Sequence, residues 1–251
     1  MFTVTVLGSA AAVPPAGNRN TALFIEAGGF RLLVDCGPEA LGQLGDAGFD
    51  ACAPDALFVT HVHGDHTLGF PMLLLARVSA KCERRLRIFC PSSVAPRLEE
   101  LCRLVYGDIA DRLLEQVELQ PLPESAGSSC TLAPGVLLST HPMEHTVPCL
   151  GLRIDHDGRA VVYSSDTSPA AGFAEFAHEA EILFHEATFS AALDPDPRHK
   201  GHSTAHEAGV IARNARARRL ALLHLHERYA GRQELLVREA RESFGGPVEA
   251  P

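Results

Sequence analysis

Four side chains that bind metal ions well fall within six positions of the segment HVHGDH, namely His61, His63, Asp65 and His66. Neutral imidazole and carboxylate are ligands that hold zinc, manganese or iron in proteins. His61 and His63 lie two residues apart, so in an extended segment both point to the same side. Gly64 allows a sharp turn, after which Asp65 and His66 face a second point. We therefore expect this loop to supply ligands to two metal ions.

Further candidate ligands are spread through the second half of the chain, each at or near the end of a predicted strand. They are His145, Asp166, His185, His202 and His224. Functional residues of α/β proteins gather at one edge of the sheets in this way. Taken singly, Asp166 could instead cap the helix that follows, and His141 or His145 could be an ordinary strand-end histidine. His224 lies in an almost wholly apolar strand, where a buried histidine needs a hydrogen-bond partner or a metal.

The elements that must position these residues are strands first, then alternating strands and helices. The predicted strands are residues 3–8, 21–27, 30–36, 55–60, 86–90, 116–122, 135–140, 149–155, 160–165, 181–187 and 219–226. The predicted helices are residues 38–48, 70–79, 93–107, 169–178, 204–215 and 231–243. There is no low-complexity linker and no tight repeat, so we expect one domain over residues 1–251. Its two halves suggest two sheets packed face to face with helices outside.

The charge of the chain gives no general attraction for nucleic acid, because the formal net charge is −9. Two local basic clusters interrupt this acidic background. They are Lys81, Arg84, Arg85 and Arg87, and Arg213, Arg216, Arg218 and Arg219. Each cluster is either a solvated surface or a contact with substrate phosphates, and the sequence leaves both possibilities open.

The composition also indicates the cellular compartment to expect. No apolar run approaches the roughly 20 residues that a membrane span needs, and the N-terminal residues alternate like a strand and lack the basic start of a signal peptide. We expect a soluble, cytoplasmic protein. The seven cysteines are scattered and form no CxxC pair, so we expect reduced thiols and neither a disulfide framework nor a zinc ribbon.

Together these segments resemble the ribonuclease Z branch of the metallo-β-lactamase superfamily. The segments that carry the likeness are HVHGDH, MEHTVPCLGLRI, VVYSSDTS, LFHEATF, GHSTAHEA and LALLHLHERY, in that order, with VLGSAAAVPPAGNRN and LLVDCGPEALGQL before them. The HxHxDH motif indicates the superfamily, whereas HEAT and HST indicate the branch. The likeness runs from about residue 3 to residue 230. It implies a four-layer αββα sandwich with a dinuclear metal site, usually zinc with manganese or iron as alternatives, and commonly a homodimer.

The resemblance also implies a role for each candidate ligand. The first metal would be held by His61, His63 and His145, the second by Asp65, His66 and His224, and Asp166 would bridge them. We prefer His145 to His141 because EHTVPCLG is the part that matches the family. Asp35, in VDCG, is expected to orient a ligand histidine.

The chemistry expected of such a site is phosphodiester hydrolysis. Two metals about 3.5–4 Å apart can lower the pKa of a shared water to around neutrality and stabilise charge on the phosphoryl oxygens. His202 in GHST is the family's candidate proton donor, Glu186 in HEAT would orient it, and Asp65 can also handle the proton of the attacking water. The alternative for His202 and Glu186 is a structural hydrogen-bonded pair.

The remaining histidines receive weaker predictions. We expect a structural role for His185, while contacts of His141, His206 or His226 with substrate stay open. The others are expected to be exposed: His156, His178 and His199.

Two departures from the family bear on the substrate. Long ribonuclease Z carries an arm that grips transfer RNA, but here only twenty residues separate His145 from Asp166, enough for one tight hairpin. The chain also reads DCGPEALGQ where ribonuclease Z has DCGEGTQ, and His226 stands where that family has Ser. We therefore expect a phosphodiesterase acting on a small diester or an RNA end.

Other functions are kept as alternatives. The first is a tRNA 3′-processing endonuclease of the ribonuclease Z type, and a sulfatase or lactonase is a lesser one. An alternative of another class is a metal-holding binding module without turnover, which the complete set of ligands together with His202 speaks against.

Overall fold

The structure is a computed structural model that describes residues 2–194 and 200–251. His199, which was expected to be exposed, lies outside the described residues. The chain forms two compact units, which we describe separately: unit 1 comprises Met1–Gly8 and Arg19–Pro123, and unit 2 comprises Ser9–Asn18 and Glu124–Pro251. The prediction of one domain over residues 1–251 stays a prediction.

Unit 1 is built on a six-stranded sheet whose strands follow one another in chain order. The strands are β1 (Phe2–Gly8), β2 (Ala22–Ala27), β3 (Phe30–Val34), β4 (Ala56–Phe58), β5 (Leu86–Pro91) and β6 (Val117–Leu122). β1 to β3 are antiparallel, and Gly28 and Gly29, both with positive φ, make the turn between β2 and β3. β3 to β6 are parallel. The ends of β3 and β4 therefore lie at the same edge of the sheet.

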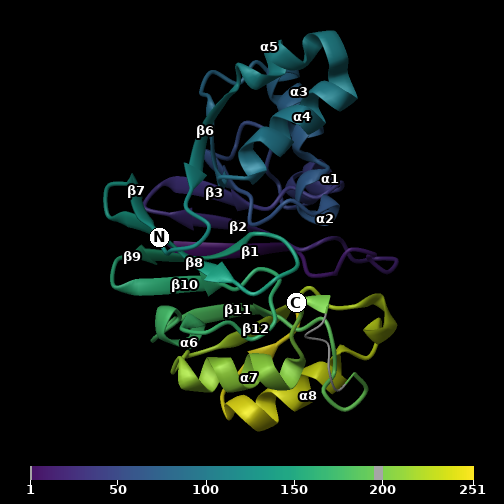
Figure 1. The fold of residues 1–251 in the computed structure, drawn as a ribbon, viewed down its shortest axis with the longest axis vertical. Helices are drawn as coiled ribbons and strands as arrows, with labels where there is room; N and C mark the ends of the chain where they lie inside the picture. Colours follow the sequence, from purple (N-terminus) through teal and green to yellow (C-terminus); the bar gives the residue numbers. More distant parts are fainter. Residues whose placement is uncertain (1, 195–199) are drawn as a thin grey trace. The chain divides into compact units, whose positions relative to one another are not determined.

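Helices pack against this sheet and fix its strands (Figure 1). They are α1 (Ala40–Asp46), α2 (Gly64–Thr67), α3 (Phe70–Ser79), α4 (Val94–Tyr106), the short η1 (Gly107–Ile109) and α5 (Ala110–Leu114). Leu33 and Leu57 of β3 and β4 share one apolar core with Leu73, Leu98 and Leu113 of the helices. Burial of each such side chain contributes about 1.5–3 kcal/mol. The strand β4, which leads into the histidine loop (residues 61–66), and its neighbour β3 are thus held from one side by the helices.

Unit 2 is a seven-stranded sheet with strand order β13-β12-β11-β10-β9-β8-β7. The strands are β7 (Ser129–Ala133), β8 (Val136–Met143), β9 (Cys149–His156), β10 (Arg159–Tyr163), β11 (Ile182–Glu186), β12 (Leu220–Leu223) and β13 (Val248–Glu249). β7 to β10 are antiparallel, and β10 to β13 are parallel. The ends of β10, β11 and β12 consequently meet at one edge.

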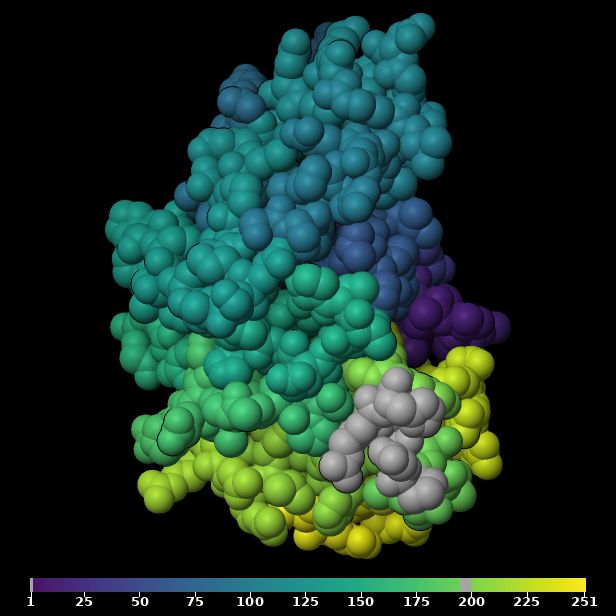
Figure 2. All heavy atoms as spheres, in the orientation of Figure 1, coloured from purple at the N-terminus to yellow at the C-terminus, as the bar shows by residue number. Residues whose placement is uncertain are grey.

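The helices of unit 2 are α6 (Phe173–Phe176), α7 (Ala205–Asn214), η3 (Glu227–Tyr229) and α8 (Gln233–Phe244). α7 and α8 lie side by side against the sheet, and α8, in yellow, is at the surface of the unit (Figures 1 and 2). A Cβ atom at Gly209 would lie only 2.0 Å from Ser243 Oγ, so the close approach of these helices requires glycine there. No helix of the residues described here is long and apolar enough to cross a membrane.

Most predicted elements are found within a few residues of their expected bounds. The helix predicted over 169–178 is wrong in extent, because only Phe173–Phe176 is helical and Gly172 before it takes a positive φ of 76°. The sequence prediction also missed β7, β13, α2 and α5, which are short or lack a clear apolar period.

The expectation that all thiols are reduced is wrong. Cys52 and Cys82 form a disulfide, with Cα atoms 5.4 Å apart. Cys52 precedes β4 and Cys82 precedes β5, and these strands are parallel neighbours, so the preceding segments are brought together. The other five cysteines are not disulfide-bonded.

We predict that replacing Cys52 and Cys82 together by Ser lowers the free energy of unfolding by about 2–4 kcal/mol, because the crosslink constrains the unfolded chain. Urea unfolding followed by circular dichroism measures this. A reductant should lower the midpoint of the wild type and leave the double variant unchanged. Equal midpoints for oxidised and reduced wild type would contradict the prediction.

Candidate metal centre

The histidine loop of unit 1 is anchored to the end of β3. Asp35 follows β3 directly, takes a positive φ of 63°, and its backbone N–H donates to the carbonyl of Phe58 in β4 over 2.8 Å. The buried Asp35 carboxylate accepts hydrogen bonds from the backbone N–H of Thr60 (2.9 Å) and from His66 Nδ1 (2.8 Å). The expected contact of Asp35 with a candidate ligand is therefore confirmed, and His66 is turned so that its Nε2 faces away from Asp35.

Two glycines let the loop approach this strand end closely. A Cβ atom at Gly37 would lie 2.2 Å from the carbonyl oxygen of Asp65, and one at Gly69 would lie 2.0 Å from the carbonyl oxygen of Gly37. The Gly69 N–H donates to the carbonyl of Cys36. The Cys36 N–H in turn donates to the carbonyl of His66. Glycine is thus required on both sides of the contact.

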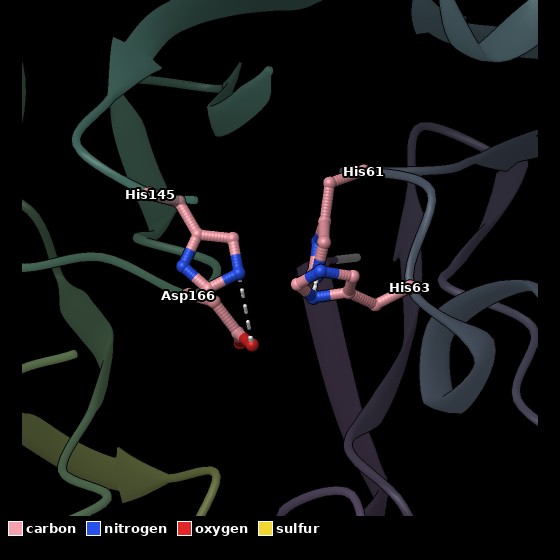
Figure 3. Close-up of side chains that lie close together, drawn as sticks. All are labelled: His61, His63, His145 and Asp166. Carbon is pink, nitrogen blue, oxygen red and sulfur yellow. Dashed lines mark hydrogen bonds and ion pairs between the residues drawn. The ribbon is translucent and has the colours of Figure 1, made fainter. Parts of the chain in front are cut away.

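The loop presents two pairs of ligand atoms. His61 Nε2 lies 3.1 Å from His63 Nδ1, and His66 Nε2 lies 3.3 Å from Asp65 Oδ2. Figure 3 draws His61 and His63 on their loop. Two ligands on one zinc ion, each at about 2.0–2.1 Å, stand roughly 3.3 Å apart in tetrahedral geometry. Both pairs have the separation that a shared cation needs, in line with the spacing argument.

Unit 2 brings three predicted ligands to the edge of its own sheet. His145 follows β8, Asp166 follows β10, and His224 follows β12 with a positive φ of 56°. Asp166 Oδ2 lies 3.2 Å from His224 Nε2 and 4.0 Å from His145 Nε2; Figure 3 shows the latter pair. All three side chains are buried. Asp166 is not the cap of a helix, because α6 begins only at Phe173.

The protonation of His145 suits a metal ligand. Burial lowers its pKa below the ordinary histidine value, although Asp166 acts in the opposite direction. His145 Nδ1 donates to the carbonyl of Gly201 over 2.8 Å. Its Nε2 is the nitrogen that faces Asp166, so a neutral ring offers a lone pair on that side.

Glu186 and His202 form the predicted hydrogen-bonded pair. The fully buried Glu186 accepts from His202 Nδ1 over 2.8 Å and from the backbone N–H groups of Thr167 (2.8 Å) and Thr188 (3.1 Å). Burial by itself would raise the pKa of the Glu186 carboxyl, but His202 brings it below the ordinary value. The carboxylate is therefore ionised and holds the His202 proton on Nδ1.

His202 is more accessible than its partners. Its side chain keeps 17% of its exposure, and its ring stacks on His224 with centroids 5.2 Å apart. Glu186, His202 and His224 could in principle hold a cation themselves, since one ligand atom of each lies within 4.8 Å of the others. Both Glu186 oxygens already accept N–H or O–H donors, so orientation of His202 fits Glu186 better.

The other histidines are placed differently. His141 donates to the carbonyl of Pro142, and its ring lies against Phe173 and Phe176 of α6. His185 is buried, and burial lowers its pKa, which favours the structural role expected for it. His206 is exposed on α7. His226 lies beside Phe189, with ring centroids 5.6 Å apart.

Arginines of both basic clusters form ion pairs within their own units. Arg84 pairs with Asp55, Arg218 with Glu181, and Arg219 with Glu249, which favours solvated surfaces. The sequence prediction overlooked two buried threonines, Thr60 and Thr188, whose hydroxyls bond both the carboxylates and the histidines. In the sequence only their positions could have indicated a role: Thr60 directly precedes HVHGDH, and Thr188 is the last residue of HEAT.

Comparison with known proteins agrees with this geometry. A family model described as the beta-lactamase superfamily domain matches residues 30–225. Ribonuclease Z of Halorubrum lacusprofundi is 32% identical over 295 residues, covering 99% of this chain and 94% of that protein. Ribonuclease BN of an Enterobacter species is 28% identical, covering 95% of this chain and 94% of that protein.

Solved structures show the same relationship. The metallo-beta-lactamase fold protein YhfI from Bacillus subtilis has a TM-score of 0.84 and 28% identity, covering 99% of this chain and 95% of that one. The short form of human tRNase Z has a TM-score of 0.77 and 26% identity, covering 91% and 94%. This chain belongs to the metallo-β-lactamase superfamily, in its ribonuclease Z-like branch. The predicted α/β fold class is confirmed, and the chain is a metal-dependent hydrolase.

We predict that Gly37→Ala displaces the histidine loop, because the new methyl group would overlap the Asp65 carbonyl. The expected loss of unfolding free energy is about 1–3 kcal/mol, with weaker zinc binding after reconstitution. Gly45→Ala is the matched control: it lies in α1 of the same unit, and nothing surrounds its Cβ position within 4 Å. Wild-type zinc binding and stability in Gly37→Ala would contradict the prediction.

Proposed function

We propose that this protein is a phosphodiesterase whose site holds two divalent metal ions. The observation that carries the proposal is the Asp166 carboxylate, whose Oδ2 is shared by the Nε2 atoms of His145 and His224 within unit 2. One oxygen facing two imidazole nitrogens would suit a carboxylate shared by two ions. The names of the relatives, ribonuclease Z and tRNase Z, support an action on phosphodiesters.

The ligand sets follow the family pattern. We assign one ion to His61, His63 and His145, the other to Asp65, His66 and His224, and the bridging position to Asp166. The donors are imidazole nitrogens and carboxylate oxygens, which suit zinc first and manganese or iron as alternatives. The residues present fit such ions, because the paired ligand atoms on the histidine loop are 3.1 and 3.3 Å apart.

When bound, two such ions supply an activated water and stabilise negative charge on the phosphoryl oxygens. The protein's own residues manage the protons. Asp65 takes the proton of the attacking water, and His202 gives a proton to the leaving oxygen. Ionised Glu186 keeps the His202 Nδ1 protonated, so the ring delivers the proton from Nε2. A binding module without turnover would have no use for this accessible, oriented His202.

The short segment between His145 and Asp166 bears on the class of substrate. β9 and β10 are joined by the tight turn of Asp157 and Gly158, so no longer segment is inserted between these two strands. Together with the net charge of −9, this favours a small cyclic or linear diester or an RNA end. Endonucleolytic 3′ processing of tRNA is the second candidate, supported by the names of the relatives.

We predict that bis(p-nitrophenyl) phosphate is hydrolysed and that Asp65→Ala and Asp166→Ala abolish this. His202→Ala should lower turnover by about 10²–10⁴-fold with nearly unchanged metal content. His206→Ala is the matched control, because His206 is exposed four residues away on α7. Undiminished activity in Asp166→Ala would overturn the mechanism.

The substrate class is tested by comparing kcat/KM for a precursor tRNA with values for cyclic nucleotides and other small diesters. A clear preference for the small diesters supports the first candidate. A preference for the precursor tRNA supports the second.

We further propose a homodimer formed through an exposed apolar patch of unit 1. The patch consists of Leu68, Met72, Leu104, Val105 and Ile109. Leu104 is 84% exposed and lines a groove with Leu68 and Leu101. Exposed apolar patches of this kind mark association surfaces. We assign a second copy of the chain as the partner that covers this patch.

We also propose that the protein acts in the cytoplasm.

We predict that Leu104→Glu converts the dimer to a monomer, since it sets a charge in the apolar patch. Light scattering after size-exclusion chromatography measures the mass. Leu193→Glu is the control, because Leu193 is an exposed leucine outside the patch in unit 2. A wild type that is monomeric at micromolar concentration would refute the dimer.

A further inference from the structure

A single buried carboxylate in unit 2 is connected to two histidines. Glu186 Oε1 accepts directly from His202 Nδ1 over 2.8 Å. Glu186 Oε2 accepts from the Thr188 hydroxyl over 2.8 Å, and the same hydroxyl oxygen lies 2.9 Å from His224 Nδ1. Glu186, Thr188 and His224 are all buried. The Thr188 hydroxyl therefore links the Glu186 carboxylate to a second imidazole, that of His224.

The direction of these hydrogen bonds fixes the protonation of His224. A threonine hydroxyl has one hydrogen, and Thr188 must give it to Glu186, because otherwise an oxygen lone pair would face a carboxylate oxygen at 2.8 Å. The hydroxyl can then only accept from His224. His224 thus carries a proton on Nδ1, which leaves Nε2, the atom that lies 3.2 Å from Asp166, as the nitrogen that a metal ion would bind.

Unit 1 contains the same arrangement with different residues. Asp35 Oδ2 accepts directly from His66 Nδ1 over 2.8 Å. The Thr60 hydroxyl donates to the Asp35 oxygens at 3.0 and 3.1 Å and lies 3.0 Å from His61 Nδ1. By the same reasoning, His61 is protonated on Nδ1 and offers Nε2, the atom paired with His63.

We propose that Thr60 and Thr188 are positioning residues that fix the Nδ1-protonated form of His61 and His224. Each unit then uses one buried carboxylate to orient two histidines, one directly and one through a threonine hydroxyl. The proposal rests on the proposed function, because it matters only if these histidines hold metal through Nε2. Outer partners of metal ligands typically change metal affinity by about 10–100-fold when removed.

Glu186 is linked directly to His202 and through Thr188 to His224, so metal binding and proton donation can be tested separately. In the proposed assignment His224 is a metal ligand and His202 is the proton donor, so Glu186 serves both. Thr188→Val removes the hydroxyl with little change of volume. It cuts the connection to His224, together with the donor to Glu186 Oε2 and a longer contact of 3.4 Å with His202 Nδ1. The direct bond from His202 to Glu186 remains.

Zinc titration of the metal-free protein by calorimetry, with chelator competition, tests the proposal. We expect two ions in the wild type and one of them bound about 10–100-fold more weakly in Thr188→Val and in Thr60→Val. Thr188→Ser and Thr60→Ser keep the hydroxyl and should restore near wild-type affinity. Thr140→Val is the matched control, because Thr140 is a buried threonine of unit 2 whose hydroxyl bonds Ser128.

The outcomes distinguish this proposal from the proposed function. A wild type that binds no zinc defeats the proposed function. A wild type that binds two ions, with Thr188→Val and Thr60→Val as tight as wild type, overturns the role of the threonines alone.

The nitrogen chemical shifts of the imidazoles in the metal-free wild type give a second, mutation-independent measurement. We expect His224 and His61 to be protonated on Nδ1. Protonation of both on Nε2 alone, with Nδ1 unprotonated, overturns the proposal even if the valine variants fail to fold.

Discussion

A carboxylate buried away from water must be surrounded by hydrogen-bond donors, and in this protein those donors are the side chains of the candidate site. Asp35 and Glu186 are both fully buried at strand ends, where an unpaired charge would be strongly destabilising. Backbone N–H groups, a threonine hydroxyl and a histidine satisfy each one. Stability and site geometry therefore depend on the same hydrogen bonds, so the histidines are oriented before any ligand arrives.

The parallel strands explain why residues far apart in sequence can share such a carboxylate. β3 and β4 end together, which sets Asp35 beside Thr60. β11 and β12 end together, which sets the residues after Glu186 beside His224. The sheets thus convert distances of some 25 to 40 residues along the chain into hydrogen bonds of about 3 Å. The positive φ at Asp35 and His224 turns the chain at the point where each side chain is needed.

The features that could be predicted from the sequence are those with a local signature. The spacing of HVHGDH indicated two pairs of ligand atoms, and the apolar runs placed β4, α3 and α4. The disulfide could not be foreseen, because the approach of Cys52 to Cys82 depends on the pairing of β4 with β5. The helix over 169–178 was overpredicted because Gly172 takes a backbone conformation that composition does not reveal. Thr60 and Thr188 were missed because threonine is common at strand ends for reasons unrelated to a site.

The tight turn between β9 and β10 has an evolutionary consequence. Asp157 and Gly158 are exposed and close a hairpin in which Arg159 pairs with His156, and such loop tips accept insertions readily. This hairpin lies between His145 and Asp166, two of the proposed metal ligands. Residues could be inserted here while Asp166 and the strand register stay fixed. The chain can therefore grow at one surface point without moving the residues of the candidate site.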